Sequence, residues 1–91
     1  MTASDAVRDY VTRLAAYTRE HARLGASPRG SIALVRAAQG RALLESRSYL
    51  IPDDVQAAAP VVFPHRMRTD PGADDAEAVV DRALESVPVD E

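Results

Sequence analysis

The pair Ser27-Pro28 constrains this chain most, because it fixes where a helix begins. Serine is a preferred N-cap, and proline suits the first helical position, where its missing N–H costs nothing. Arg29 then lies in the first turn, where the helix dipole disfavours a cation by about 0.3–1 kcal/mol. A bound anion would remove that penalty, since free backbone N–H groups and the guanidinium would act on it together. Ser27, Pro28, Arg29 and Gly30 are therefore candidates for half of a phosphate site, and a solvated surface arginine is the alternative.

Apolar side chains recur at helical spacing along most of the chain, which predicts an all-α fold, a single four-helix bundle. Each helical segment has its own start signal: a capping serine, the Ser27-Pro28 pair, a proline followed by two aspartates, and an acidic turn. Pro60 should kink or end the third helix, and Pro64 closes that region. The expected helices span residues 4–19, 28–46, 52–63 and 75–86.

The expected core is built from one apolar stripe on each helix. The second helix is apolar over most of its circumference, which is typical of a helix at the centre of a domain. Tyr10, Tyr17 and Tyr49 are expected in the core with their hydroxyls at water. The stripes on the other three helices are Val7, Tyr10, Val11, Leu14 and Thr18; Val55, Ala58, Ala59, Val62 and Phe63; and Ala76, Val79, Val80, Ala83 and Leu84.

Two short extended pieces flank the third helix. Pro52 pushes Ile51 toward an extended conformation, and residues 48–51 could pair with residues 65–68. This tiny two-stranded β pair is the most β structure that we expect, and its direction stays open.

The composition excludes several classes of chemistry from this chain. It has no cysteine, so disulfides and thiolate sites are impossible, and no lysine, so a P-loop or Schiff-base lysine is impossible too. A formal net charge of −3 argues against nucleic acid as a partner. No apolar stretch approaches a membrane span and no signal peptide pattern is visible, so we expect a cytoplasmic protein without membrane insertion.

The other titratable residues do not form a catalytic or metal centre in the sequence. His21 and His65 are too few for a metal site, which needs three or four ligands. Helix-start chemistry accounts for Asp53 and Asp54, and also for the acidic residues at 74, 75 and 77. The chain alone is therefore not expected to be an enzyme.

Several stretches, in the same order, resemble the C-terminal lid of MoxR-family AAA+ ATPases. The resemblance covers residues 5–68 and extends to the last helix. The matching stretches are VRDYV at 7–11, TREH at 18–21, LGASPRG at 24–30, YLIPDDV at 49–55, APVV at 59–62 and HRMR at 65–68.

This resemblance implies that residues 1–91 are a helical lid whose nucleotide-binding core, with its Walker motifs, lies outside this chain. It assigns Arg29 the sensor-2 role, contacting the γ-phosphate of ATP that is bound with Mg²⁺ on the core, while the isolated lid is expected to bind no cofactor. The implied partners are that core, neighbouring subunits of a hexameric ring and a von Willebrand factor A-domain protein. The implied function is ATP hydrolysis in a chaperone-like or protein-maturation machine.

Three positions depart from the family pattern. Ile51 replaces a threonine cap, Gly30 replaces an alanine, and the loop between His21 and Leu24 is shorter than usual. Two alternatives remain open: a stand-alone helical protein-interaction module without an ATPase role, and a helix-turn-helix DNA-binding protein. The acidic balance disfavours the second.

Overall fold

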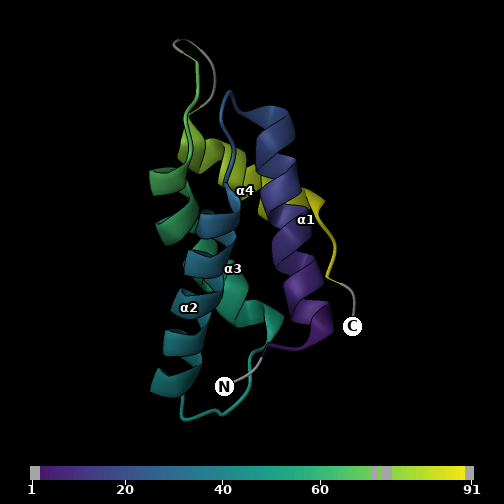
Figure 1. Ribbon diagram of the computed structural model, residues 1–91, viewed down its shortest axis with the longest axis vertical. Helices are drawn as coiled ribbons and strands as arrows, with labels where there is room; N and C mark the ends of the chain where they lie inside the picture. The colour runs from purple at the N-terminus through teal and green to yellow at the C-terminus, as the bar shows by residue number, and fades with distance from the viewer. Residues whose placement is uncertain (1–2, 71, 73–74, 90–91) are drawn as a thin grey trace.

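The chain folds into a bundle of four α-helices with one 3₁₀ turn (Figure 1), and the computed structural model describes residues 3–70, 72 and 75–89. The predicted all-α class is confirmed. The helices are α1 (Asp5–His21), α2 (Pro28–Leu44), α3 (Pro52–Val62) and α4 (Ala76–Ser86), and the 3₁₀ turn η1 is Phe63–Arg66.

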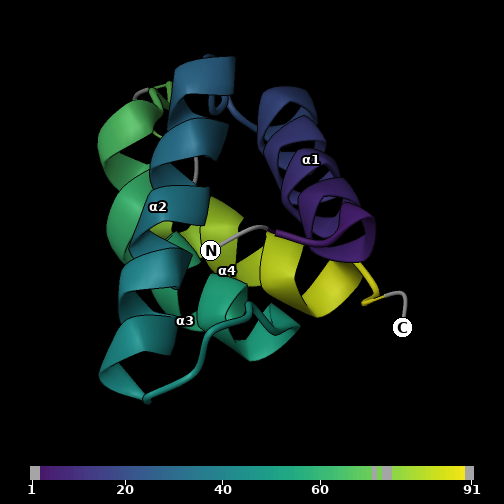
Figure 2. The same cartoon turned by 60° about the horizontal axis from the view of Figure 1, so that its bottom comes forward.

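The helices form two pairs that share one core. The long helices α1 and α2 run along the molecule while α4 crosses behind them, as a second view also shows (Figure 2). Helix α2 packs chiefly against α3, and α4 packs against α1, α3 and η1. The largest fully buried side chains, which come from all four helices and η1, are Tyr10, Phe63, Leu14, Leu34, Val55, Val79, Val80, Thr18 and Asp54.

Side-chain caps begin three of the helices, and the sequence predicted two of them, Ser4 and Ser27. The Oγ atoms of Ser4 and Ser27 accept the N–H groups of Val7 and Gly30 at 3.2 and 3.3 Å. Asp75 caps α4 in the same way. Helix α3 begins at Pro52 without a side-chain cap from the residue before it, and it ends at Val62, two residues after Pro60.

The expectation that α2 is the central helix is wrong. Only one side of α2 is buried, and Ile32, Leu43 and Leu44 are 55, 66 and 88% exposed. The apolar circumference of α2 is wider than α1 and α3 can cover, because α4 lies away from it. Tyr49 is also misassigned to the core, since it is 58% exposed, whereas Tyr10 is buried.

The expected pairing of residues 48–51 with 65–68 is also wrong. Instead, Leu24 and Arg68 form an isolated antiparallel bridge, with N···O distances of 3.0 and 2.8 Å. Residues 63–66 are coiled in η1, so extended backbone begins only at Met67. Gly25 lets the loop between α1 and α2 lie against α1, because a Cβ at this position would overlap the backbone of α1. That close approach brings Leu24 beside Arg68.

Among the described residues, no helix is long and apolar enough to cross a membrane.

Candidate functional site

The start of α2 is held firmly against α1. The N–H of buried Ala26 donates to Oγ1 of buried Thr18 at 3.0 Å, and the carbonyl of Ala26 accepts from Nε of Arg19 at 3.0 Å. Ala26 directly precedes the N-cap, and both its N–H and its carbonyl are hydrogen-bonded to α1, so the start of α2 has little freedom to move. The position of Arg29 is therefore set by the fold.

Within the part of the chain that the structure describes, the first turn of α2 keeps one backbone N–H without an acceptor, fewer than the sequence suggested. Pro28 has none, and the N–H groups of Gly30 and Ser31 are taken by the side chain and the carbonyl of Ser27. No described group accepts the N–H of Arg29. Recognition of an anion here must therefore depend mainly on side chains.

Three arginines surround a shallow hollow at this helix start. The hollow measures about 380 Å³ and is lined by Arg29, Ile32, Ala33, Arg36 and Arg66. Arg29, Arg36 and Arg66 are exposed, and none of them forms a hydrogen bond or ion pair with another described residue. Among the described residues, no carboxylate lines the hollow, so it is a cationic surface with an apolar floor.

Arg66 reaches this hollow from η1, and sequence reasoning missed it. Gly30 is buried, and a Cβ built on it would lie 3.4 Å from Cβ and 3.6 Å from Cγ of Arg66. The aliphatic stem of Arg66 thus rests on Gly30, next to Arg29. Nothing in the spacing along the chain predicts this contact, because Gly30 and Arg66 belong to two elements that are far apart in the sequence.

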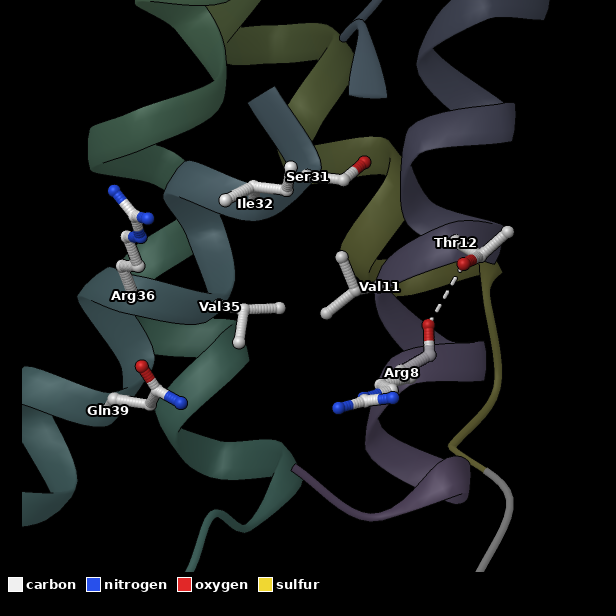
Figure 3. A pocket seen from close by; sticks show the side chains of 8 residues that line it. All are labelled: Arg8, Val11, Thr12, Ser31, Ile32, Val35, Arg36 and Gln39. Carbon is white, nitrogen blue, oxygen red and sulfur yellow. Dashed lines mark hydrogen bonds between the residues drawn. The ribbon is translucent and has the colours of Figure 1, made fainter. Parts of the chain in front are cut away.

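A second hollow continues the surface along the groove between α1 and α2. It measures about 430 Å³, and its lining includes Val11 and Val35, whose side chains face each other across the groove (Figure 3). Arg8 points from α1 toward α2, while Arg36 points away from α1. Ile32 and Arg36 line both hollows, so the two form one continuous face of α2.

Asp54 forms a buried ion pair that sequence reasoning also missed. Its carboxylate is fully buried and accepts two hydrogen bonds from Arg47, at 2.6 and 2.7 Å, and one from the Ile51 N–H at 3.0 Å. The guanidinium of Arg41 lies 3.5 Å away. Arg47 holds the pKa of Asp54 below its ordinary value of 3.8, against the opposing effect of burial. Asp54 thus has the expected role at the start of α3, and in addition its ion pair with Arg47 fastens the connection between α2 and α3.

The remaining candidates lie apart from the hollow. His21 ends α1 and stacks on Tyr17, with ring centroids 3.9 Å apart, and His65 is exposed in η1. Asp74 lies outside the described residues. In the part of the chain that the structure describes, no three histidine or acidic side chains are grouped to hold a metal ion.

Known proteins share the sequence pattern and the fold of this chain. Residues 14–85 match the family model described as the AAA lid domain. The chain is 46% identical over 96% of its length to the uncharacterized protein YeaC of Bacillus subtilis, and 37% identical over 90% of its length to the chaperone MoxR1 of Mycobacterium tuberculosis. A crystal structure of a putative ATPase from Cytophaga hutchinsonii superposes on 99% of the chain with a TM-score of 0.90 at 25% identity.

The matches cover only part of each relative. This chain spans 29% of the Bacillus protein, 26% of the Mycobacterium protein and 32% of the crystallised ATPase.

Proposed function

This chain belongs to the AAA lid domain family and is a lid of the MoxR type, and we propose that it closes over ATP bound on a nucleotide-binding core of the same protein. The observation that carries the proposal is the exposed Arg29 at the fixed start of α2, whose side chain pairs with no other residue that the structure describes. In this role Arg29 is the sensor-2 residue and contacts the γ-phosphate of ATP.

The groups around Arg29 fit phosphate oxygens. Guanidinium groups and a free N–H are hydrogen-bond donors, and guanidinium matches the geometry of phosphate with paired, charge-assisted bonds. These groups cannot ligate a cation, so Mg²⁺ would be held by the core and by the phosphates. ATP supplies the phosphoanhydride bond, while Ser27, Pro28 and Gly30 fix the place from which Arg29 reaches it.

Arg29 would serve both hydrolysis and lid movement. A guanidinium on the γ-phosphate stabilises the charge that develops during phosphoryl transfer. The same contact exists only while the γ-phosphate is present, so nucleotide state would set the angle between lid and core. In a ring of such subunits, that angle would link hydrolysis to work on a protein substrate.

Replacing Arg29 with alanine in the full-length ATPase tests the proposal. We expect the rate of ATP hydrolysis to fall by about 10²-fold, which is the usual effect of removing one preorganised electrostatic contact. Arg68→Ala is the matched control, because Arg68 is exposed nearby but does not line the hollow. Equal hydrolysis rates for Arg29→Ala and the control would refute the role of Arg29.

We further propose the assembly that the family suggests: a hexameric ring that works as a chaperone-like machine together with a von Willebrand factor A-domain protein. The name of the Mycobacterium relative, a chaperone, supports the kind of activity. Light scattering of the full-length protein with and without ATP would measure the subunit number.

A further inference from the structure

We propose that Arg66 is a second phosphate-binding residue of the lid, and that its guanidinium and that of Arg29 hold one polyphosphate between them. This inference rests on the proposed function, because it places a nucleotide against the start of α2. It adds a residue from a separate element, η1, which reaches the site across Gly30.

The backbone places the two arginines side by side. The stem of Arg66 lies on Gly30, the residue that follows Arg29, and both side chains line the same hollow. Both elements are also tied together behind the site. The Leu24–Arg68 bridge lies two residues after Arg66 and five before Arg29, so each side chain leaves a short segment that is fastened to the other.

The charge of the hollow calls for an anionic ligand. Arg29, Arg36 and Arg66 repel one another, and no described carboxylate pairs with any of them. The three arginines gather on one hollow although the chain has a net charge of −3 and its acidic residues outnumber its arginines. Like charges gathered on a hollow concentrate the positive potential there, and a polyphosphate would relieve the repulsion.

Arg36 is assigned a different role within the same hollow. It lies seven residues after Arg29, which is two turns or about 10 Å along the helix. One phosphate group cannot reach guanidiniums that leave the helix so far apart unless both extend fully toward each other. We therefore assign phosphate contact to Arg29 and Arg66, and only long-range attraction to Arg36.

A carboxylate on the docked core is the competing ligand for Arg66. It would satisfy the same guanidinium, but its effect would not depend on the number of phosphates in the nucleotide. Comparing ATP with AMP in one variant therefore separates the two ligands, since AMP lacks the β- and γ-phosphates.

The experiment measures nucleotide binding by full-length Arg66→Met, whose side chain keeps an unbranched stem on Gly30 but loses the charge. We expect the Kd for ATP to rise about tenfold, as for loss of one charge-assisted contact to phosphate. The Kd for AMP should stay within twofold. Arg68→Met is the matched control, with the same chemical change two residues away and outside the hollow, and both of its Kd values should stay unchanged.

Three results would overturn the inference. The first is an ATP affinity of Arg66→Met equal to that of Arg68→Met. The second is an equal loss of ATP and AMP affinity, and the third is slower hydrolysis at unchanged ATP affinity. Either of the last two would assign Arg66 to docking of the core. If Arg66→Met fails to fold by circular dichroism, Arg66→Lys carries the test, because it keeps stem and charge but loses the planar fork. Its ATP affinity should fall severalfold, and an unchanged affinity would count against the inference.

Failure of this inference can be told apart from failure of the proposed function. A loss of hydrolysis in Arg29→Ala with no effect of Arg66→Met would leave the sensor-2 role standing and remove only Arg66. Weaker ATP binding in Arg66→Met with normal hydrolysis in Arg29→Ala would leave the phosphate contact of Arg66 standing and remove the sensor-2 role of Arg29.

Discussion

Asp54 shows how one residue can tie two helices together through charge. Its carboxylate has no exposed surface, and its partners come from the end of α2, from the connection after it and from the backbone before α3. A buried carboxylate without such partners would cost several kcal/mol. Because the hydrogen bonds to Arg47 lower the pKa of Asp54, the carboxylate stays charged in the folded chain well into the acidic range.

We expect Asp54→Asn to lower the free energy of unfolding at about pH 7 by about 2 kcal/mol, since it removes the hydrogen bonds of a charged pair. The pKa of Asp54 is lower in the folded chain than in the unfolded chain, so its contribution is complete above pH 3.8 and is lost as the pH falls through the folded-state pKa. Urea unfolding of the variant at several acidic pH values should therefore show a weaker dependence on pH. Asp53→Asn is the control, because Asp53 is exposed, and an equal effect there would contradict this account.

At the scale of the element, the start of α3 lacks a side-chain N-cap. Ile51 occupies the N-cap in an extended conformation, and its side chain can accept no hydrogen bond. The Asp54 side chain does accept the Ile51 N–H, so half of a capping box is present. The missing half is a hydroxyl at position 51.

Ile51→Thr should supply that hydroxyl for an N–H of the first turn of α3. Threonine also removes part of a half-buried apolar side chain, so the comparison to make is with Ile51→Val, which has the shape of threonine without the hydroxyl. We expect the threonine variant to unfold with a free energy about 1 kcal/mol higher than the valine variant. Thermal unfolding of the two would check this, and equal stabilities would mean that no cap forms.

Helix positions could be predicted from the sequence, whereas contacts between elements could not. The caps at Ser4, Ser27 and Asp75 act over three residues, so the sequence alone contains the whole interaction. The pairing of Leu24 with Arg68 and the arrival of Arg66 at Gly30 depend on how the chain returns in three dimensions. The arginine at the start of α2 was therefore predictable, and the one beside it was not.

At the scale of the whole molecule, α2 has one buried side and one apolar side that the domain leaves open. Leu34 is fully buried, while Leu44 on the same helix is 88% exposed. A hollow between α2 and α3, lined by Leu44 and Val61 among others, continues this apolar surface. In the sequence, α2 resembles a central helix because it is apolar on two sides. Only one of these sides belongs to the core of this domain.

Alanine at these two leucines should separate the two sides of α2. Leu34→Ala removes buried methyl groups and should lower the free energy of unfolding by about 2–5 kcal/mol. Leu44→Ala should change it by less than about 0.5 kcal/mol, because little surface is lost to water. Urea unfolding of both variants measures the difference, and similar losses would show that the exposed side is covered in solution.

The Leu24–Arg68 bridge has a mechanical consequence for the lid. It clamps the segment that leads into α2 to the segment that leaves η1, close to both arginines of the proposed site. If the lid rotates on its core, Arg29 and Arg66 must therefore move as one rigid body, and the distance between them stays the same in the open and the closed positions of the lid.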